Sequence, residues 1–358
     1  MKLRNVVHFF VIGVMSIFTF IAMSNDNLMA QKTYKLKVDT FWGPEYHATK
    51  NAVLPSLRAI EEKSNGRIKF DIYYAKSLAK PTEGYDATAM GITDIYWFTG
   101  PNYETGSMDR GAIFSLPFAL PLGKENVQAA SNIMYEVFQK HVEQEIVSGV
   151  EVLGWGPLSE YKFITVDKVK EMQDLRGMTV RSSGGYHDDI IKAVGGSPEY
   201  LGPGEIYEAL ERGILDGIFW TYAALYGYGS YDPVNYATSL GFTTFPFYTV
   251  MNKGTFEKLP KDLQKIVSET FKEYAPKAGI SYYDAGKKHF PEMELEEIDF
   301  TEAEKQKIMK ATIEPVWQEW IKRCKKKDIP YKEMIQDLAK AWQNQGLTPP
   351  KAWVKLGQ

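Results

Sequence analysis

Arg181 is the side chain whose position and chemistry point most directly to a binding function. The alternation in Met178-Thr179-Val180-Arg181 places it at the carboxyl end of a predicted strand, just before Gly184-Gly185. In open α/β sheets, such strand ends face the ligand crevice. A guanidinium group presents a planar fork of donors that matches a carboxylate bidentately, which lysine cannot reproduce. On this local pattern alone, an ordinary solvated arginine is still a slightly better explanation.

Aromatic residues gather near the same kind of predicted strand end. They are Trp42, Trp97, Phe98, Tyr161 and Trp220. Ligand pockets are often lined by aromatic side chains, but large rings dominate protein cores as well, so both explanations stay open for each ring. Core packing accounts less readily for four tyrosines of a later loop, which are Tyr222, Tyr226, Tyr228 and Tyr231.

Residue patterns typical of catalysis or metal binding are weak. The five histidines are scattered, and the sequence holds no HExxH, GxSxG or phosphate-loop pattern. Adjacent helix residues point in different directions, so His187-Asp188-Asp189 predicts a solvated helix start rather than a metal site. A pair of carboxylates of the glycosidase kind stays open, although nothing singles out a pair. We therefore predict no catalytic residue, no metal and no cofactor.

The single cysteine, Cys324, lies among Arg323, Lys325, Lys326 and Lys327. One cysteine cannot form an internal disulfide, and no histidine lies near it in the sequence. Although the neighbouring positive charges could lower the pKa of its thiol, we expect an incidental thiol on a solvated helix face.

The first residues have the order of a secretory signal peptide. Lys2 and Arg4 precede an apolar run from Val6 to Met23, and a small residue, Ala30, follows. We predict cleavage after Ala30, which makes residues 1–30 the signal peptide. The apolar run is long enough to span a bilayer, so an uncleaved membrane anchor is the alternative.

Length and charge limit the classes of protein. A chain of 358 residues with such a leader predicts two domains in the exported part. The chain carries 42 basic and 45 acidic residues; without Lys2, Arg4 and Asp26 the counts are 40 and 44, a net charge of −4. Nucleic acid is therefore not expected as a partner.

The hydrophobic pattern alternates between strands and helices. The expected strands cover residues 34–39, 68–74, 94–98, 150–155, 161–166, 178–181, 215–220 and 245–252. The main expected helices cover 83–90, 126–148, 301–325 and 330–344, with a long helical region after Leu259-Pro260 that Pro276 and Gly279 interrupt. This alternation predicts mostly parallel sheets with helices on their faces. Without any low-complexity linker, two lobes should be joined by several ordered crossings.

Three segments together resemble the DctP family of TRAP transporter solute receptors. They are Asp174-Leu175-Arg176-Gly177-Met178-Thr179-Val180-Arg181, Gly195-Gly196-Ser197-Pro198, and Glu205 to Gly217. Supporting matches occur at Leu116-Pro117-Phe118, Glu61 to Gly66 and Leu259-Pro260, so the resemblance covers nearly the whole mature chain.

The resemblance implies a periplasmic, two-lobed receptor of the type II-like binding-protein fold, with its ligand cleft between the lobes and long C-terminal helices. It implies that the lobes close over a small organic acid, that Arg181 pairs with the ligand carboxylate, and that membrane subunits of the transporter then receive the ligand. By the same matching, further pocket positions are Phe41, Trp42, Trp97, Tyr161 and Trp220, with Lys80 as a weaker candidate.

Two departures from the family pattern narrow the expected ligand. Some family members bind a metal through a carboxylate at the position of Phe219, so no bridging metal is expected. Some members specific for sialic acid carry a second arginine where Tyr161 falls and an asparagine where Trp220 falls. These substitutions favour a monocarboxylate with an apolar or aromatic body over a highly polar sugar acid.

The expected lobe I comprises residues 31–158 and 246–285, and lobe II comprises residues 159–245 and 286–358. Two other classes of function stay open. A secreted hydrolase could use the same cleft, and a receptor could report to a sensor instead of a transporter. Neither the identity of the ligand nor the oligomeric state follows from the sequence.

Overall fold

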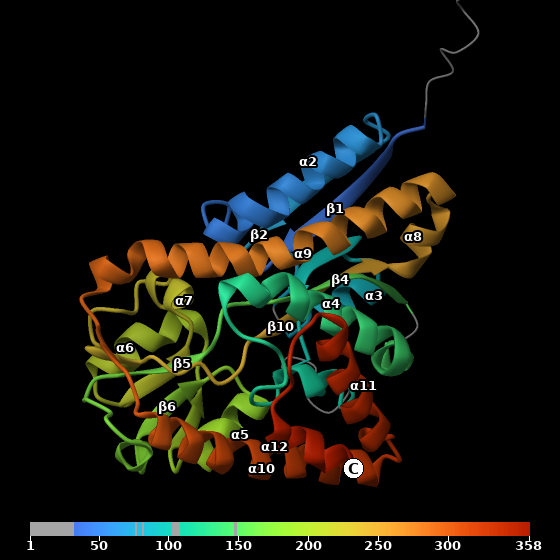
Figure 1. Ribbon diagram of the computed structural model, residues 1–358. Helices are drawn as coiled ribbons and strands as arrows, with labels where there is room; N and C mark the ends of the chain where they lie inside the picture. Colours follow the sequence, from blue (N-terminus) through green and yellow to red (C-terminus); the bar gives the residue numbers. More distant parts are fainter. Residues whose placement is uncertain (1–31, 76, 81, 102–107, 147–148) are drawn as a thin grey trace, which may run out of the picture.

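The structure is a computed structural model that describes residues 32–75, 77–80, 82–101, 108–146 and 149–358. The predicted signal peptide or anchor, residues 1–30, lies outside the described residues, as does the expected end of the helix at Ser148. Two separate β-sheets organise the described part of the chain (Figure 1).

The first sheet has five strands. Their spatial order is β2 (Ile68–Tyr74), β1 (Tyr34–Thr40), β3 (Ile95–Thr99), β10 (Pro246–Asn252) and β4 (Val150–Pro157). Strand β1 runs parallel to β2 and β3, whereas β10 runs antiparallel to β3 and β4. The helices that pack beside this sheet are α2 (Leu54–Lys63), α3 (Gly84–Ala89), α4 (Val127–Val137), α8 (Lys253–Lys258) and α9 (Lys261–His289).

The second sheet has six strands. Their spatial order is β11 (Glu296–Ile298), β9 (Tyr236–Thr238), β5 (Lys162–Thr165), β8 (Gly217–Trp220), β6 (Thr179–Ser182) and β7 (Ser197–Tyr200). The helices of this part of the chain are α5 (Tyr186–Ala193), α6 (Ile206–Glu211) and α7 (Tyr222–Gly227). Strand β6 is parallel to both β7 and β8, so Arg181 lies in a parallel part of this sheet as expected.

Each sheet mixes parallel and antiparallel pairs: among the described strands five pairs are parallel and four are antiparallel, so the expected parallel pairing is present but does not extend through either sheet. The antiparallel pairs involve β10 in the first sheet and β5 in the second. Both strands enter their sheet directly from the other sheet by a short extended segment. Parallel pairing is expected only where a helical crossover joins two strands, and these two connections contain none.

Three segments carry the chain from one sheet to the other, which confirms the expectation of several ordered crossings. They are residues 158–161, 239–245 and 290–295. The first two crossings are bonded together, because Leu158 N donates to Phe245 O at 3.0 Å and Tyr161 N donates to Thr243 O at 2.8 Å. Backbone pairing of this kind holds the junction between the sheets in register.

Helix α9 runs unbroken through Pro276 and Gly279, so the predicted interruption is wrong. The helix lies directly on β4 with very close backbone approach. A Cβ at Gly154 would come within 2.8 Å of Phe271 O, and a Cβ at Gly279 would overlap Pro157 O. Gly279 therefore permits contact with the strand rather than ending the helix, and packing along β4 offsets the backbone hydrogen bond that Pro276 cannot donate.

The C-terminal helices return across the molecule beneath α9 (Figure 1). They are α10 (Glu302–Lys326), α11 (Tyr331–Asn344) and α12 (Lys351–Val354). Helix α10 packs against α5 beside the second sheet, whereas α11 packs against α4 beside the first. These helices thus contact elements of both halves. Within the described residues, none of the helices combines the length and apolarity needed to cross a membrane.

Cys324 on α10 is fully buried, so the expectation of a thiol on a solvated face is wrong. Burial raises the pKa of the thiol to about 12. The basic residues around Cys324 in the sequence occupy other sides of the helix, because consecutive helical residues are rotated by about 100°. The thiol is therefore an unreactive part of the core.

Candidate functional site

A cavity of about 30 Å³ lies between the two sheets and is walled by residues of both. The residues on the side of the first sheet are Phe41, Phe98, Leu158, Phe245 and Tyr282. The residues on the side of the second sheet are Tyr161, Arg181, Ser183, Pro203, Trp220, Ala224 and Tyr228. Most of these side chains are apolar or aromatic, and Arg181 supplies the charge.

Arg181 lies in β6 and is only 3% exposed, which overturns its interpretation as a solvated surface arginine. Its Nε donates to Leu201 O at 3.0 Å, and its Nη1 donates to Ser183 Oγ at 2.9 Å. The guanidinium carbon lies 4.8 Å from the centre of the Trp220 ring. These contacts fix the plane of the guanidinium at the cavity, so an anion that enters meets donors already oriented.

Trp220, at the end of β8, forms the aromatic wall next to Arg181. Its ring stacks on that of Tyr228, with centroids 5.5 Å apart and planes inclined by 23°. An arginine cation and two stacked rings thus place a positive charge next to a flat apolar surface.

Tyr161 lies beside Ser183, with the two hydroxyl oxygens 3.3 Å apart. Ser183 therefore connects Arg181 and Tyr161 through one hydroxyl. Burial raises the pKa of Tyr161, so the phenol is neutral and can donate a hydrogen bond to an oxygen of a ligand.

His187 packs behind Tyr161, with the two ring centroids 4.4 Å apart. It is fully buried among aromatic rings, so the prediction of a solvated helix start is wrong at this residue. Burial lowers the pKa of His187 to about 3, and the cation of Arg181 acts in the same direction. A neutral imidazole therefore supports the site near neutral pH.

Phe98 faces the cavity, and its neighbour Trp97 does not. Phe98 packs on Phe41 at 5.1 Å and on Phe245 at 5.3 Å. Trp97 is fully buried behind them against Phe247, at 5.6 Å, as expected for side chains that alternate along β3. The backbone of Phe98 has φ of +87°, a conformation that side-chain-bearing residues rarely adopt and that recurs at functional sites.

Four of the seven predicted ligand-contacting residues line the cavity: Phe41, Tyr161, Arg181 and Trp220. Trp42 lies one layer behind, where its Nε1 donates to Tyr282 Oη at 3.1 Å. Trp97 lies in the core, and Lys80 is 74% exposed beside Glu83 on the surface. The structure therefore does not bring Trp97 or Lys80 to this cavity.

Sequence reasoning did not select eight wall residues, which are Phe98, Leu158, Ser183, Pro203, Ala224, Tyr228, Phe245 and Tyr282. Two of them, Phe98 and Tyr228, stood among the noted aromatic residues. Ser183 follows Arg181 by two positions, which places it on the same face of an extended chain. Tyr282 is one of many residues on a long helix, and no local pattern marks it.

Phe219, at the position considered above for a metal-binding carboxylate, is fully buried. Its ring packs on Phe163 at 4.8 Å and on Tyr161 at 5.5 Å. In the described part of the chain, no group of three or more His, Cys, Asp or Glu side chains is arranged to hold a metal ion. The chemistry of the cavity is that of a cation with aromatic walls, which suits an organic anion.

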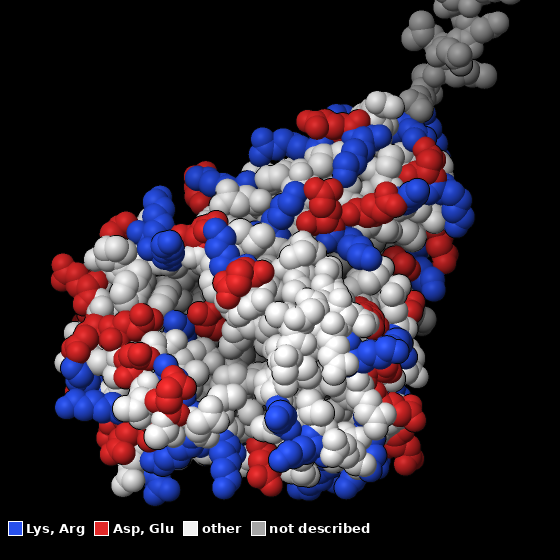
Figure 2. Space-filling view, viewed as in Figure 1, with Lys and Arg blue, Asp and Glu red and all other residues white. Residues whose placement is uncertain are grey.

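The surface around the site carries both signs of charge. Figure 2 shows acidic and basic side chains interleaved over one face of the molecule, around a broad uncharged area. On that face, the described residues form no extended patch of a single sign. On this face, the surface charge does not favour an anion over a cation, and the positive charge inside the cavity comes from Arg181.

Solved structures share this fold. One is a TRAP solute-binding protein from Rhodoferax ferrireducens in complex with copurified benzoate, with a TM-score of 0.80 and 22% identity over 88% of this chain and 99% of that one. Another is a TRAP solute-binding protein from a marine metagenome, in complex with 3-hydroxybenzoate. Its TM-score is 0.80 and its identity 21%, over 87% of this chain and 99% of that one. Both likenesses establish a two-lobed receptor fold.

Sequence comparison identifies the family. The C4-dicarboxylate-binding periplasmic protein DctP of Rhodobacter capsulatus is 22% identical over 254 residues, which are 66% of this chain and 74% of that protein. The family model described as bacterial extracellular solute-binding protein, family 7, matches residues 40–323. That match spans most of the chain and includes the cavity residues and every strand of both sheets except β1, of which it contains only Thr40. The chain therefore belongs to the DctP family of TRAP-type periplasmic solute receptors.

Proposed function

We propose that this receptor captures a small monocarboxylate with an aromatic or apolar body in the cavity between its two sheets. Arg181 holds the carboxylate, and Trp220, Tyr228, Phe98 and Phe41 enclose the body. The observation that carries the proposal is the buried guanidinium of Arg181, oriented by Leu201 and Ser183 against aromatic walls.

The composition of the walls supports an aromatic acid over a polar one. Among the cavity residues, Arg181 is the one with a formal charge, and most of the others are aromatic or apolar. A sugar acid would leave several hydroxyls without partners against these rings, at a cost of about 1–3 kcal/mol for each group. Two relatives with the same fold have benzoate and 3-hydroxybenzoate bound.

Binding proceeds in this proposal by hinge closure. A cavity of about 30 Å³ is far smaller than ligand pockets of roughly 300–1,000 Å³, so the described arrangement leaves too little room for a ligand. The halves must separate to admit a ligand, and the ligand stabilises the closed state because only there do both sheets contact it. In this proposal, residues 1–30 are the signal peptide that exports the receptor. Lobe I comprises residues 31–158 and 246–285, and lobe II comprises residues 159–245 and 286–358. The closed receptor then delivers its ligand to the TRAP membrane subunits.

A thermal-shift screen tests the proposal. We expect benzoate and 3-hydroxybenzoate to raise the melting temperature, because a ligand at 100 times its Kd stabilises the folded state by about 2.7 kcal/mol. Succinate and D-glucuronate serve as polar controls and should give smaller shifts. A larger shift with either control would contradict the proposed ligand class. Mass spectrometry after incubation should return the bound acid unchanged, and a product would instead support the hydrolase alternative.

A further inference from the structure

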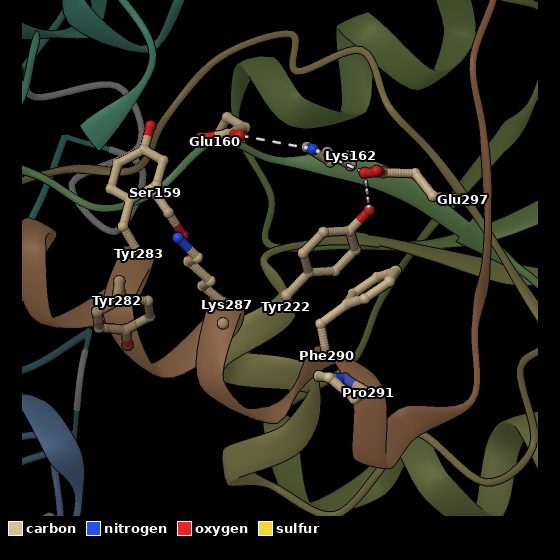
Figure 3. A pocket seen from close by; sticks show the side chains of 11 residues that line it. Ser159, Glu160, Lys162, Tyr222, Tyr282, Tyr283, Lys287, Phe290, Pro291 and Glu297 are labelled. Carbon is tan, nitrogen blue, oxygen red and sulfur yellow. Dashed lines mark hydrogen bonds and ion pairs between the residues drawn. The ribbon is translucent and has the colours of Figure 1, made fainter. Parts of the chain in front are cut away.

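A second and larger cavity, of about 280 Å³, lies beside the first and opens on the surface. Figure 3 shows side chains entering it from α9, from the start of α7, and from the strands of the second sheet. Tyr282 lines both cavities, so its ring forms the partition between them. The volume of the second cavity is near the lower limit of small-molecule pockets, which is roughly 300 Å³.

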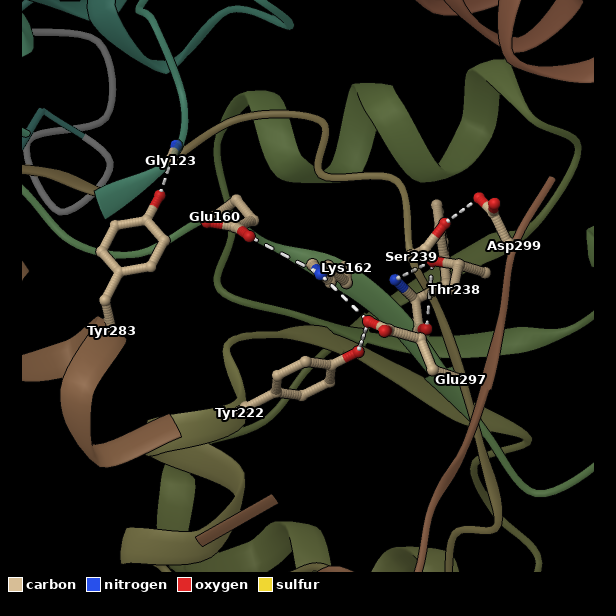
Figure 4. Close-up of polar contacts among 10 residues, drawn as sticks. Gly123, Glu160, Lys162, Tyr222, Thr238, Ser239, Tyr283, Glu297 and Asp299 are labelled. Carbon is tan, nitrogen blue, oxygen red and sulfur yellow. Dashed lines mark hydrogen bonds and ion pairs between the residues drawn. The ribbon is translucent and has the colours of Figure 1, made fainter. Parts of the chain in front are cut away.

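The carboxylates of this cavity are already engaged. Lys162 Nζ lies 3.5 Å from Glu160 Oε1 and 3.3 Å from Glu297 Oε1, and Tyr222 Oη donates to the same Glu297 oxygen at 2.8 Å (Figure 4). Lys162 is largely buried, and its ammonium also lies 4.9 Å from the centre of the Tyr222 ring. This cluster forms a wall in which Lys162 offsets the charge of the carboxylates, although the second oxygen of Glu160, Oε2, is buried without a hydrogen-bond partner among the described residues.

Lys287 supplies the remaining charge. It is exposed on α9 and extends into the cavity, and it forms neither an ion pair nor a hydrogen bond with any described residue (Figure 3). The apolar part of the wall is aromatic, since Tyr222 packs on Phe290 at 4.9 Å and Tyr282 closes the inner end. An ammonium beside aromatic rings matches an anion with an apolar body.

The cavity also lies at the junction of the two halves. Ser159 and Glu160 belong to the crossing between β4 and β5, and Phe290 and Pro291 belong to the crossing between α9 and β11. Residues that join two lobes change their relative positions when the lobes open or close. A molecule bound between two crossings therefore makes different contacts with the protein in the open state and in the closed state.

We propose that this junction cavity is a second binding site for a small organic anion with an apolar body, in which Lys287 pairs with the anionic group. The inference goes beyond the proposed function and does not depend on Arg181. Since the site adjoins two crossings, its occupancy is coupled to opening of the inner cavity. Coupling of this kind is reciprocal, so each site changes the affinity of the other by the same factor.

Fluorine NMR with 4-fluorobenzoate as the probe separates the two sites. At millimolar probe, we expect two bound resonances, of which Arg181→Met removes one. Lys287→Gln should weaken the other at least tenfold, because it replaces the ammonium with a neutral amide. Lys287→Arg should restore it. Lys288→Gln is the matched control, because Lys288 is the next residue of α9, is exposed, and does not line the cavity.

The outcomes distinguish this inference from the proposed function. If Lys287→Gln leaves every bound resonance unchanged, the second site is wrong. If Arg181→Met removes every bound resonance, the second site is wrong as well. A spectrum with one bound resonance that depends on Lys287 and not on Arg181 would support the second site and contradict the proposed function.

Discussion

At the scale of single residues, the burial of Arg181 determines what the site can bind. A cation that is 3% exposed has given up most of its hydration, and its contacts with the carbonyl of Leu201 and the hydroxyl of Ser183 are hydrogen bonds to neutral groups. A carboxylate is the partner that offsets this loss best, because charge-assisted hydrogen bonds contribute roughly 1.5–3 kcal/mol each.

Trp220 provides a test of the aromatic wall. Replacing Trp220 with Ala removes the ring that packs on both Arg181 and Tyr228, and we expect the Kd for benzoate to rise by about 10- to 100-fold. Trp220→Phe should retain part of the affinity. Calorimetric titration measures both variants, with Tyr207→Ala, an exposed aromatic position, as the control. An unchanged Kd for Trp220→Ala would show that the ring does not contact the ligand.

His187 predicts an acid-sensitive stability. Its pKa is lowered from 6.5 to about 3 in the folded protein, so the unfolded state binds the proton more readily. The contribution to stability is complete above pH 6.5 and is lost as the pH falls toward 3. Between pH 7 and pH 5 this one group should cost the wild type about 2 kcal/mol.

Urea denaturation of His187→Phe at pH 7 and pH 5 measures this contribution. The phenyl ring keeps the contacts with Tyr161, Phe219 and Phe245 and cannot be protonated. Between pH 7 and pH 5, the variant should lose about 2 kcal/mol less in its free energy of unfolding than the wild type loses. Equal losses in both proteins would show that the acid sensitivity comes from other groups, such as the half-buried His47, whose pKa is also lowered to about 3.

At the scale of elements, local patterns located the strands and helices but not every direction in which side chains point. The strand that ends in Arg181 and the glycine loop after it were predicted from alternation and turn residues, and they are confirmed. Trp97 was selected as a pocket position by the family resemblance, and local patterns do not separate it from Phe98, because both are aromatic residues at the same strand end. All residues of β3 are buried, so no polar partner in the sequence marks which face meets the cavity.

Other errors arise from contacts between distant segments. Pro276 and Gly279 are helix breakers by propensity, and only the docking of α9 on β4 shows why the helix continues. The same docking brings Tyr282 to the site from a position 101 residues after Arg181. Periodicity within a window of about 18 residues contains no information about such an approach.

The close approach of α9 and β4 yields a paired prediction. Gly279→Ala places a methyl group against the Pro157 carbonyl, so we expect a loss of about 1–3 kcal/mol in the free energy of unfolding. Gly254→Ala in α8 is the matched control, because its methyl group meets only Asn252 Oδ1 at 3.4 Å. There, helix propensity should leave stability unchanged or raise it by about 0.5–1 kcal/mol. Equal effects in urea denaturation would contradict the packing described.

At the scale of the whole molecule, two separate sheets are linked by three crossings and by α9, which contacts both halves. This arrangement allows one half to rotate against the other while the crossings keep their backbone bonds. Membership of the DctP family supports the same architecture, and the family has the same two lobes.

Closure can be measured with spin labels on the two halves. Lys69→Cys in β2 and Arg212→Cys after α6 both place labels at exposed positions. Cys324 is buried and its thiol pKa is raised to about 12, so it should not compete for the label. Saturating benzoate should shift the distance distribution between the labels and narrow it. The same shift in the Arg181→Met background would show that closure does not depend on carboxylate binding.

The most direct test of the central claim is calorimetric titration of benzoate into wild type, Arg181→Lys and Arg212→Lys. Lysine keeps the charge but not the planar fork, so Arg181→Lys should weaken binding by more than about tenfold while its melting temperature without ligand stays near that of the wild type. Arg212→Lys, at a surface position that is 71% exposed, should bind as the wild type does. An Arg181→Lys protein that binds benzoate with unchanged affinity would contradict the assignment of Arg181 as the carboxylate-binding residue.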